Sequence, residues 1–170
     1  MEFDAATDTR LLQGLAEAPE INQIKSRVHR LRDSGAIEDQ QLDLILSHSV
    51  LEHVAQPRAF FQDLKRMLRQ DGFMLHIADY SDHFFKYPYH FLQFSKKTWN
   101  RYLNPGDLPG WRLGDHLVIL QELGLEVSIL EEQSDAAAFA RIRPYISSDY
   151  DPEDLHIATT QAVLAIARKS

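Results

Sequence analysis

Two short apolar runs on either side of an amphipathic segment constrain the fold of this sequence most. Leu42–Leu46 and Phe73–Ile77 are each bounded by polar residues and have the length of a buried strand. Between them, Pro57 can begin a helix, and the apolar residues that follow have helical spacing: Phe60, Phe61, Leu64, Met67 and Leu68. Asp71-Gly72 is expected to close this helix. The pattern predicts two adjacent parallel strands joined by a right-handed crossover.

The remaining periodicity completes an α/β domain. It predicts helices over Thr9–Glu17, Asp115–Leu123 and Asp135–Arg141, and strands over Ile21–Leu31, Leu125–Leu130 and Gln161–Ala167, although alanine-rich composition leaves the last open to a helix. We therefore expect a single domain over residues 1–170, with a Rossmann-like, mostly parallel sheet, flanking helices and antiparallel C-terminal strands. An aromatic-rich segment, residues 80–113, is expected to form an insert or lid.

Composition excludes several classes of function. The net charge of -7 argues against nonspecific nucleic-acid binding, which needs a basic surface. No apolar stretch approaches the roughly 20 residues of a membrane span, so no membrane partner is expected. The start of the chain has neither a basic region nor an apolar core of the secretory kind, and there are no cysteines. These features indicate a cytoplasmic protein.

Two segments resemble the class I S-adenosylmethionine-dependent methyltransferases, of the group called methyltransferase type 11. The first, Asp43–Val54, is similar to the family's fourth strand, which ends in a small polar turn and continues into a Leu-Glu-His-Val helix. The second, Leu64–Gly72, is similar to its leucine-rich segment ending in Pro-Gly-Gly, with Gln70-Asp71 in place of Pro-Gly. The resemblance covers about residues 33–132 and implies S-adenosylmethionine as cofactor.

The carboxyl ends of the two predicted strands carry polar side chains. In an open parallel sheet, ligands bind at this edge. We expect Ser47, His48 and Ser49, after the first strand, to line the cofactor side. His76, Asp79 and His83, after the second, are expected to line the substrate side, with His76 or His83 as the base and an aspartate orienting it.

Several of these residues have alternative interpretations. His53 either contacts substrate or packs the short helix against the sheet. The cluster from His76 to His83 could instead hold a metal ion in a hydrolase, or form a polar strand end in which Asp82 caps the next helix. The aromatic side chains of the insert could line a substrate pocket, but core packing is the better interpretation for Phe91, Phe94 and Trp99.

The glycine-rich turn that holds a nucleotide in such folds is missing from the sequence. Only Gly14 and Gly35 precede the Asp43 strand, and they do not form a Gly-x-Gly motif. Three strand–helix units of about 30 residues each do not fit before Leu42. We therefore expect a domain incomplete at its N-terminus, in which Asp4 could bind the ribose hydroxyls and Asp33 could lie near the adenine. Both could also be solvated loop residues.

The sequence thus predicts methyl transfer from S-adenosylmethionine to a small metabolite or saccharide, impaired in this chain alone by the missing turn. Either truncation or natural degeneration would explain that gap. The alternative is a non-catalytic interaction module, in which an open sheet edge pairs with a partner or a second copy of the chain.

Overall fold

The computed structural model describes residues 31, 33–85, 87–104 and 108–169, which fall into two compact units, Met1–Ala36 and Ile37–Ser170. In the first unit the described residues include one 3₁₀ turn, η1 (Ser34–Ala36). The helix expected over Thr9–Glu17 lies outside the described residues, as does the strand expected over Ile21–Leu31 except for its last residue.

The second unit contains a four-stranded mixed sheet in the order β1-β2-β4-β3. β1 and β2 are parallel, whereas β4 is antiparallel to both β2 and β3. The sheet therefore combines a parallel pair with antiparallel C-terminal strands, as the sequence predicts. Its strands are β1 (Leu42–His48), β2 (Leu68–Asp79), β3 (Leu125–Ser134) and β4 (Thr159–Arg168).

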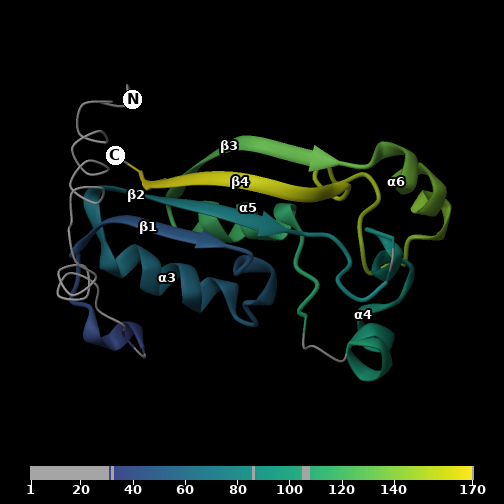
Figure 1. The fold of residues 1–170 in the computed structure, drawn as a ribbon, viewed down its shortest axis with the longest axis horizontal. Helices are drawn as coiled ribbons and strands as arrows, with labels where there is room; N and C mark the ends of the chain where they lie inside the picture. Colours follow the sequence, from purple (N-terminus) through teal and green to yellow (C-terminus); the bar gives the residue numbers. More distant parts are fainter. Residues whose placement is uncertain (1–30, 32, 86, 105–107, 170) are drawn as a thin grey trace, which may run out of the picture. The chain divides into compact units, whose positions relative to one another are not determined.

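The central prediction, that the two apolar runs are parallel neighbours, is confirmed. Leu44 pairs with Phe73 and Leu46 with Leu75 in a parallel register. The chain passes from β1 to β2 through a 3₁₀ turn, η2 (Leu51–His53), and the amphipathic helix α3 (Pro57–Met67). Figure 1 shows both strands pointing the same way, with the insert beyond their carboxyl ends.

The prediction that Asp71-Gly72 closes the helix is wrong. α3 ends at Met67, and both residues lie inside β2, which starts at Leu68. A β-carbon on Gly72 would lie 2.8 Å from the carbonyl oxygen of Asp43, closer than such atoms approach one another. Glycine therefore lets the start of β2 approach β1, where the register shifts. This strand pairing overrides the turn signal in the sequence.

The C-terminal elements match their predicted types. α5 (Leu113–Glu122) ends before Gly124, whose φ of 65° suits glycine, and α6 (Ala136–Ile142) begins at Asp135, whose side chain accepts a hydrogen bond from the Ala138 amide. The ambiguous segment near residue 164 is a strand, because its alternate residues are buried in the sheet: Ala162, Leu164 and Ile166.

Helices α3 and α5 share one hydrophobic core with the sheet. Phe61, Leu64 and Met67 of α3 and Leu113 and Leu120 of α5 are buried together with strand residues that include Met74, Leu164 and Ile166. This core fixes the ends of β1 and β2, from which the polar side chains of the candidate site extend.

The aromatic insert builds a second core. It contains η3 (His90–Gln93), α4 (Lys96–Thr98) and the π-helical turn η4 (Trp99–Leu103), and it packs with α6 and η5 (Arg143–Tyr145). Phe91 and Trp99 are buried and Phe94 packs against them, so the packing prediction for these three residues is confirmed. None of the described helices has the length and apolar character needed to cross a membrane.

Candidate functional site

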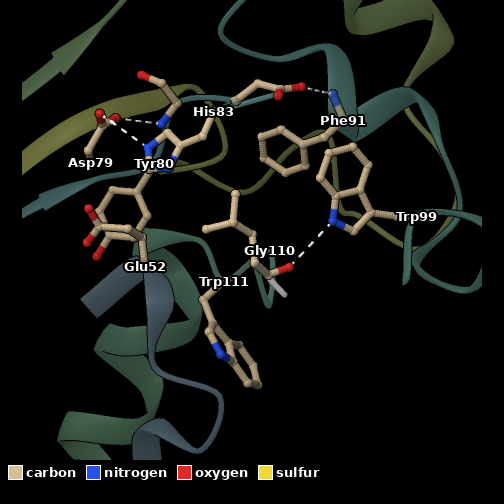
Figure 2. A pocket seen from close by; sticks show the side chains of 11 residues that line it. Glu52, Asp79, Tyr80, His83, Phe91, Trp99, Gly110 and Trp111 are labelled. Carbon is tan, nitrogen blue, oxygen red and sulfur yellow. Dashed lines mark hydrogen bonds and ion pairs between the residues drawn. The ribbon is translucent and has the colours of Figure 1, made fainter. Parts of the chain in front are cut away.

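A small pocket, open to solvent, lies beyond the carboxyl end of β2 (Figure 2). η2 contributes Glu52, and the segment that leaves β2 contributes residues 79–83. The insert contributes Phe91 and Trp99, and the segment before α5 closes the remaining side with Leu108, Gly110 and Trp111. Ligands bind at this end of the strands in open α/β sheets, so this pocket is the candidate substrate site.

Asp79 and His83 form a pair at the mouth of the pocket. His83 Nε2 lies 3.3 Å from Asp79 Oδ2, and the two side chains are 28% and 37% exposed. The other oxygen of Asp79 accepts a hydrogen bond from the Ser81 amide (2.8 Å), which fixes the carboxylate. The ring of His53 lies 5.5 Å from that of His83. The fold thus brings together three of the four predicted catalytic residues, and an imidazole oriented by a carboxylate can accept a proton.

The fourth, His76, lies apart from this group. Its ring is fully buried between the sheet and α3, where Nδ1 lies 2.6 Å from Ser47 Oγ and Phe61 packs edge-on against it. Burial lowers the pKa of His76 to about 4. His76 does not line the pocket. The geometry therefore gives its predicted role as a base no support.

The predicted cofactor residues at the end of β1 have different surroundings. Ser47 is engaged with His76, whereas His48 and Ser49 are exposed and form a hydrogen bond of 3.1 Å between Nδ1 and Oγ. Ser49 has a φ of 52° and donates its amide to the carbonyl of Ile77 (2.8 Å). This tight turn leaves exposed polar groups at the strand end, which fits one wall of a cofactor site.

The two predicted acidic cofactor residues belong to the other unit. Asp33 is exposed, and its carboxylate accepts a hydrogen bond from the Gly35 amide (2.9 Å). Asp4 lies outside the described residues. Their roles as cofactor ligands stay predictions.

The aromatic side chains of the insert were one of the sequence-based alternatives for a pocket wall, whereas Glu52 was not among the predicted catalytic residues. Glu52 is 5% exposed, and within the described part of the chain neither of its carboxylate oxygens has a hydrogen-bond partner. Tyr80 and Trp111 face the same hollow as Phe91 and Trp99. The only sequence signal for Glu52 is its place beside His53 in the turn after β1.

A buried polar network supports the wall of the pocket. The guanidinium of Arg112 donates hydrogen bonds to the carbonyls of Tyr80, Ile157 (2.8 Å) and Thr159. The Tyr80 hydroxyl lies 2.8 Å from His116 Nδ1. Burial lowers the pKa of Arg112 to about 10 and raises that of Tyr80. Arg112 is thus a structural cation that joins the insert to β4.

A metal centre finds no support in the geometry. Among residues 31, 33–85, 87–104 and 108–169 there is no group of three or more histidine, aspartate or glutamate side chains arranged to hold an ion. Asp82, one member of the predicted cluster, instead accepts hydrogen bonds from the amides of Phe84, Phe85 and Phe91. It therefore orders the start of the insert.

Comparison with known proteins supports the resemblance seen in the sequence. Residues 4–76 match a family model described as a methyltransferase domain. The solved structure of phosphoethanolamine N-methyltransferase 2 from Haemonchus contortus, in complex with S-adenosyl-L-methionine, is 13% identical with a TM-score of 0.51, and the match covers 81% of this chain and 36% of that one. Comparison with curated protein sequences gives no match.

A second solved structure, the YcgJ protein of Bacillus subtilis, matches with 13% identity and a TM-score of 0.49 over 83% of this chain and 68% of that one. The chain spans about a third of the Haemonchus protein, and the two share a fold. The match over residues 4–76 thus makes this part of the chain similar to the methyltransferase domain family, and the Haemonchus structure shows the fold that the chain shares.

Proposed function

We propose that this protein transfers a methyl group from S-adenosylmethionine to a small metabolite or saccharide bound in the pocket beyond β2. The observation that carries the proposal is the Asp79–His83 pair, which lies in a pocket at the strand ends of a methyltransferase fold. The cofactor would supply an electrophilic methyl group. His48 and Ser49 are the described residues that fit one wall of its site.

His83 is the proposed base. Its Nε2 faces Asp79, which orients the ring and stabilises the imidazolium once a proton arrives from the acceptor. The pocket is small, which favours a metabolite or a single sugar unit over a polymer. The aromatic walls exclude water from much of the acceptor and hold it near the base.

The test combines cofactor binding with turnover. Calorimetry of the 170-residue chain with S-adenosylmethionine is expected to show binding, and incubation with a metabolite panel should release S-adenosylhomocysteine. His83→Asn should lower kcat by about 100-fold and leave cofactor affinity within about twofold, because removal of a general base affects proton transfer. His156→Asn is the matched control, since His156 also pairs with a carboxylate, Glu132 (3.1 Å), but does not line the pocket.

Two results would contradict the proposal. Turnover unchanged in His83→Asn would remove the base from this pocket. A folded dimer that shows no heat with millimolar S-adenosylmethionine would instead favour the non-catalytic interaction module.

A further inference from the structure

Glu52 is a buried carboxylate that lacks the compensation such groups need. A buried charge is stable in a protein only when it is paired or hydrogen-bonded. Glu52 is 95% buried, since 5% of it is exposed, and neither oxygen has a hydrogen-bond partner within the described part of the chain. The buried cation of Arg112 donates its hydrogen bonds to backbone carbonyls. A positively charged ligand in the pocket that Glu52 lines would supply the missing partner of this carboxylate.

The charged side chains that line the pocket also favour a positively charged ligand. The described lining of the pocket includes three carboxylates, Glu52, Asp79 and Asp82, and one imidazole, but neither lysine nor arginine. Asp79 is engaged by His83, and Asp82 by backbone amides of the insert. Glu52 is the carboxylate of these three that is left for a ligand.

The walls around this carboxylate are aromatic. Tyr80, Phe91, Trp99 and Trp111 all line the pocket, and Figure 2 shows them on different sides of it. The indole N–H of Trp111 donates to the carbonyl of Val54 (2.9 Å), and that of Trp99 is directed to the carbonyl of Leu108 (3.4 Å), so both rings are held in place by their edges. The faces of aromatic rings attract cations, most strongly when the site is desolvated.

We propose that the pocket binds its acceptor through an ammonium group, which pairs with Glu52 and contacts the aromatic rings. The acceptor is then a small amine, and the reaction is an N-methylation. This inference rests on the proposed function and narrows its substrate class. A carboxylate alone would suit any donor group, but a carboxylate among aromatic rings favours a cation that is only partly hydrated.

The amine enters protonated and reacts neutral. The proton leaves the nitrogen for His83, and the freed lone pair forms the bond to the methyl carbon. The carbon–sulfur bond of the donor breaks, and its electrons remain on sulfur as the neutral thioether. Glu52 thus selects the cation, and Asp79 stabilises the imidazolium that the transfer leaves behind.

The experiment measures binding of a cation and its neutral analogue without cofactor. At pH 7.5 the wild-type chain is titrated with n-butylammonium and with 1-butanol by calorimetry and by tryptophan fluorescence. We expect the ammonium to bind at least tenfold more tightly than the alcohol. Glu52→Gln should abolish that preference, while Glu126→Gln, an exposed change of the same chemistry on β3, should retain it.

A stability measurement separates a binding role from a structural one. Without ligand, Glu52→Gln should melt a few degrees higher than wild type, because a carboxyl group without hydrogen-bond partners costs more to bury than an amide. The ammonium should raise the melting temperature of wild type but not of Glu52→Gln. Equal affinity for the ammonium and the alcohol in wild type, or an unchanged preference in Glu52→Gln, would overturn the inference.

Three further outcomes distinguish failure of this inference from failure of the proposed function. Methyl transfer to a neutral acceptor without ammonium binding would overturn the amine assignment and leave the proposed function intact. Ammonium binding in a chain that does not bind S-adenosylmethionine would retain the cation site and contradict the function. A peptide that contains a lysine with a free ε-ammonium group and binds more tightly than n-butylammonium would overturn the small-molecule assignment in favour of a protein side chain.

Discussion

At the scale of single residues, the side chain with most structural consequence is Arg112. It is 2% exposed, its guanidinium donates to three backbone carbonyls, and it lies 5.3 Å from the ring centre of Phe91 and 5.6 Å from that of Tyr80. These contacts connect the insert, the end of β2 and the start of β4 through one cation. Long-range carbonyl contacts of this kind cannot be seen in the sequence, where Arg112 appears as a polar residue beside Trp111.

Arg112→Ala is expected to lower the free energy of unfolding by about 3 kcal/mol or more, because three carbonyls lose a charged hydrogen-bond donor and a buried volume is left empty. Urea denaturation followed by tryptophan fluorescence gives the value. Arg69→Ala is the comparison, since Arg69 is 50% exposed and its ion pairs with Asp43 and Asp71 are at the surface. Arg69→Ala should lower the free energy of unfolding by less than about 1 kcal/mol. Equal losses in both variants would contradict the structural role of Arg112.

At the scale of elements, the start of β2 depends on one glycine. Gly72→Ala would place a β-carbon 2.8 Å from the Asp43 carbonyl and 3.0 Å from that of Leu42, and both are backbone atoms of β1. We expect the free energy of unfolding to fall by about 1–3 kcal/mol, because the two strands must separate locally. Chemical denaturation of the purified variant measures the loss.

Gly114→Ala provides the matched control in α5. There the added carbon would meet the carboxylate of Asp154, 2.7 Å away, which is a side chain and can move. Alanine also favours a helix over glycine by about 1 kcal/mol, so this variant should be neutral or stabilised. A larger loss in Gly114→Ala than in Gly72→Ala would contradict the close approach of β1 and β2.

The types and pairing of the helices and strands were easier to predict from the sequence than the residues at which they end. Periodicity was enough to predict β1, α3, α5 and the parallel pairing, because each buries one regular apolar face. The prediction that the helix ends at Asp71-Gly72 failed. There the backbone conformation is determined by strand pairing with β1, and the local turn signal is overridden. The polar strand end likewise predicted a histidine, either His76 or His83, oriented by an aspartate, and in the structure His83 pairs with Asp79.

The rest of the site depends on contacts between distant segments. Glu52 meets Trp99 and Trp111 in one pocket only after β1, β2 and the insert have folded together. The burial of His76 follows in the same way from α3, which packs Phe61 against its ring. A strand residue can face either side of a sheet, and the sequence pattern around His76 does not state which side α3 and α5 will cover.

At the scale of the whole molecule, two buried histidines couple folding to pH. His76 and His116 are both fully buried under α3, where Phe61 packs edge-on against each ring. The pKa of each is lowered to about 4, for His76 by burial and for His116 by burial first and then by the neighbouring His76 and Arg112. Both rings are therefore neutral in the folded protein near pH 7, and an acid proton has to enter the core to charge them.

The direction of the pH effect depends on which state, unfolded or folded, binds a proton at the higher pH. In the unfolded chain each histidine takes up a proton as the pH falls through about 6.5, whereas the folded chain resists until about pH 4. The unfolded state therefore binds more protons between these values, and stability falls as the pH falls. Each histidine adds a slope of up to about 1.4 kcal/mol per pH unit over this window, and neither contributes above it.

Urea denaturation at several values between pH 4.5 and 7.5 tests this coupling. His116→Gln should reduce the slope by up to about 1.4 kcal/mol per pH unit, because the amide cannot take up a proton while its oxygen can still accept from the Tyr80 hydroxyl. His48→Gln, at an exposed position, should leave the slope close to that of wild type. A wild-type free energy of unfolding that stays constant across this range would mean that the two rings are not kept neutral by the core. The close packing of α3 and α5 over β2 would then need revision, because it is this packing that excludes water from both rings.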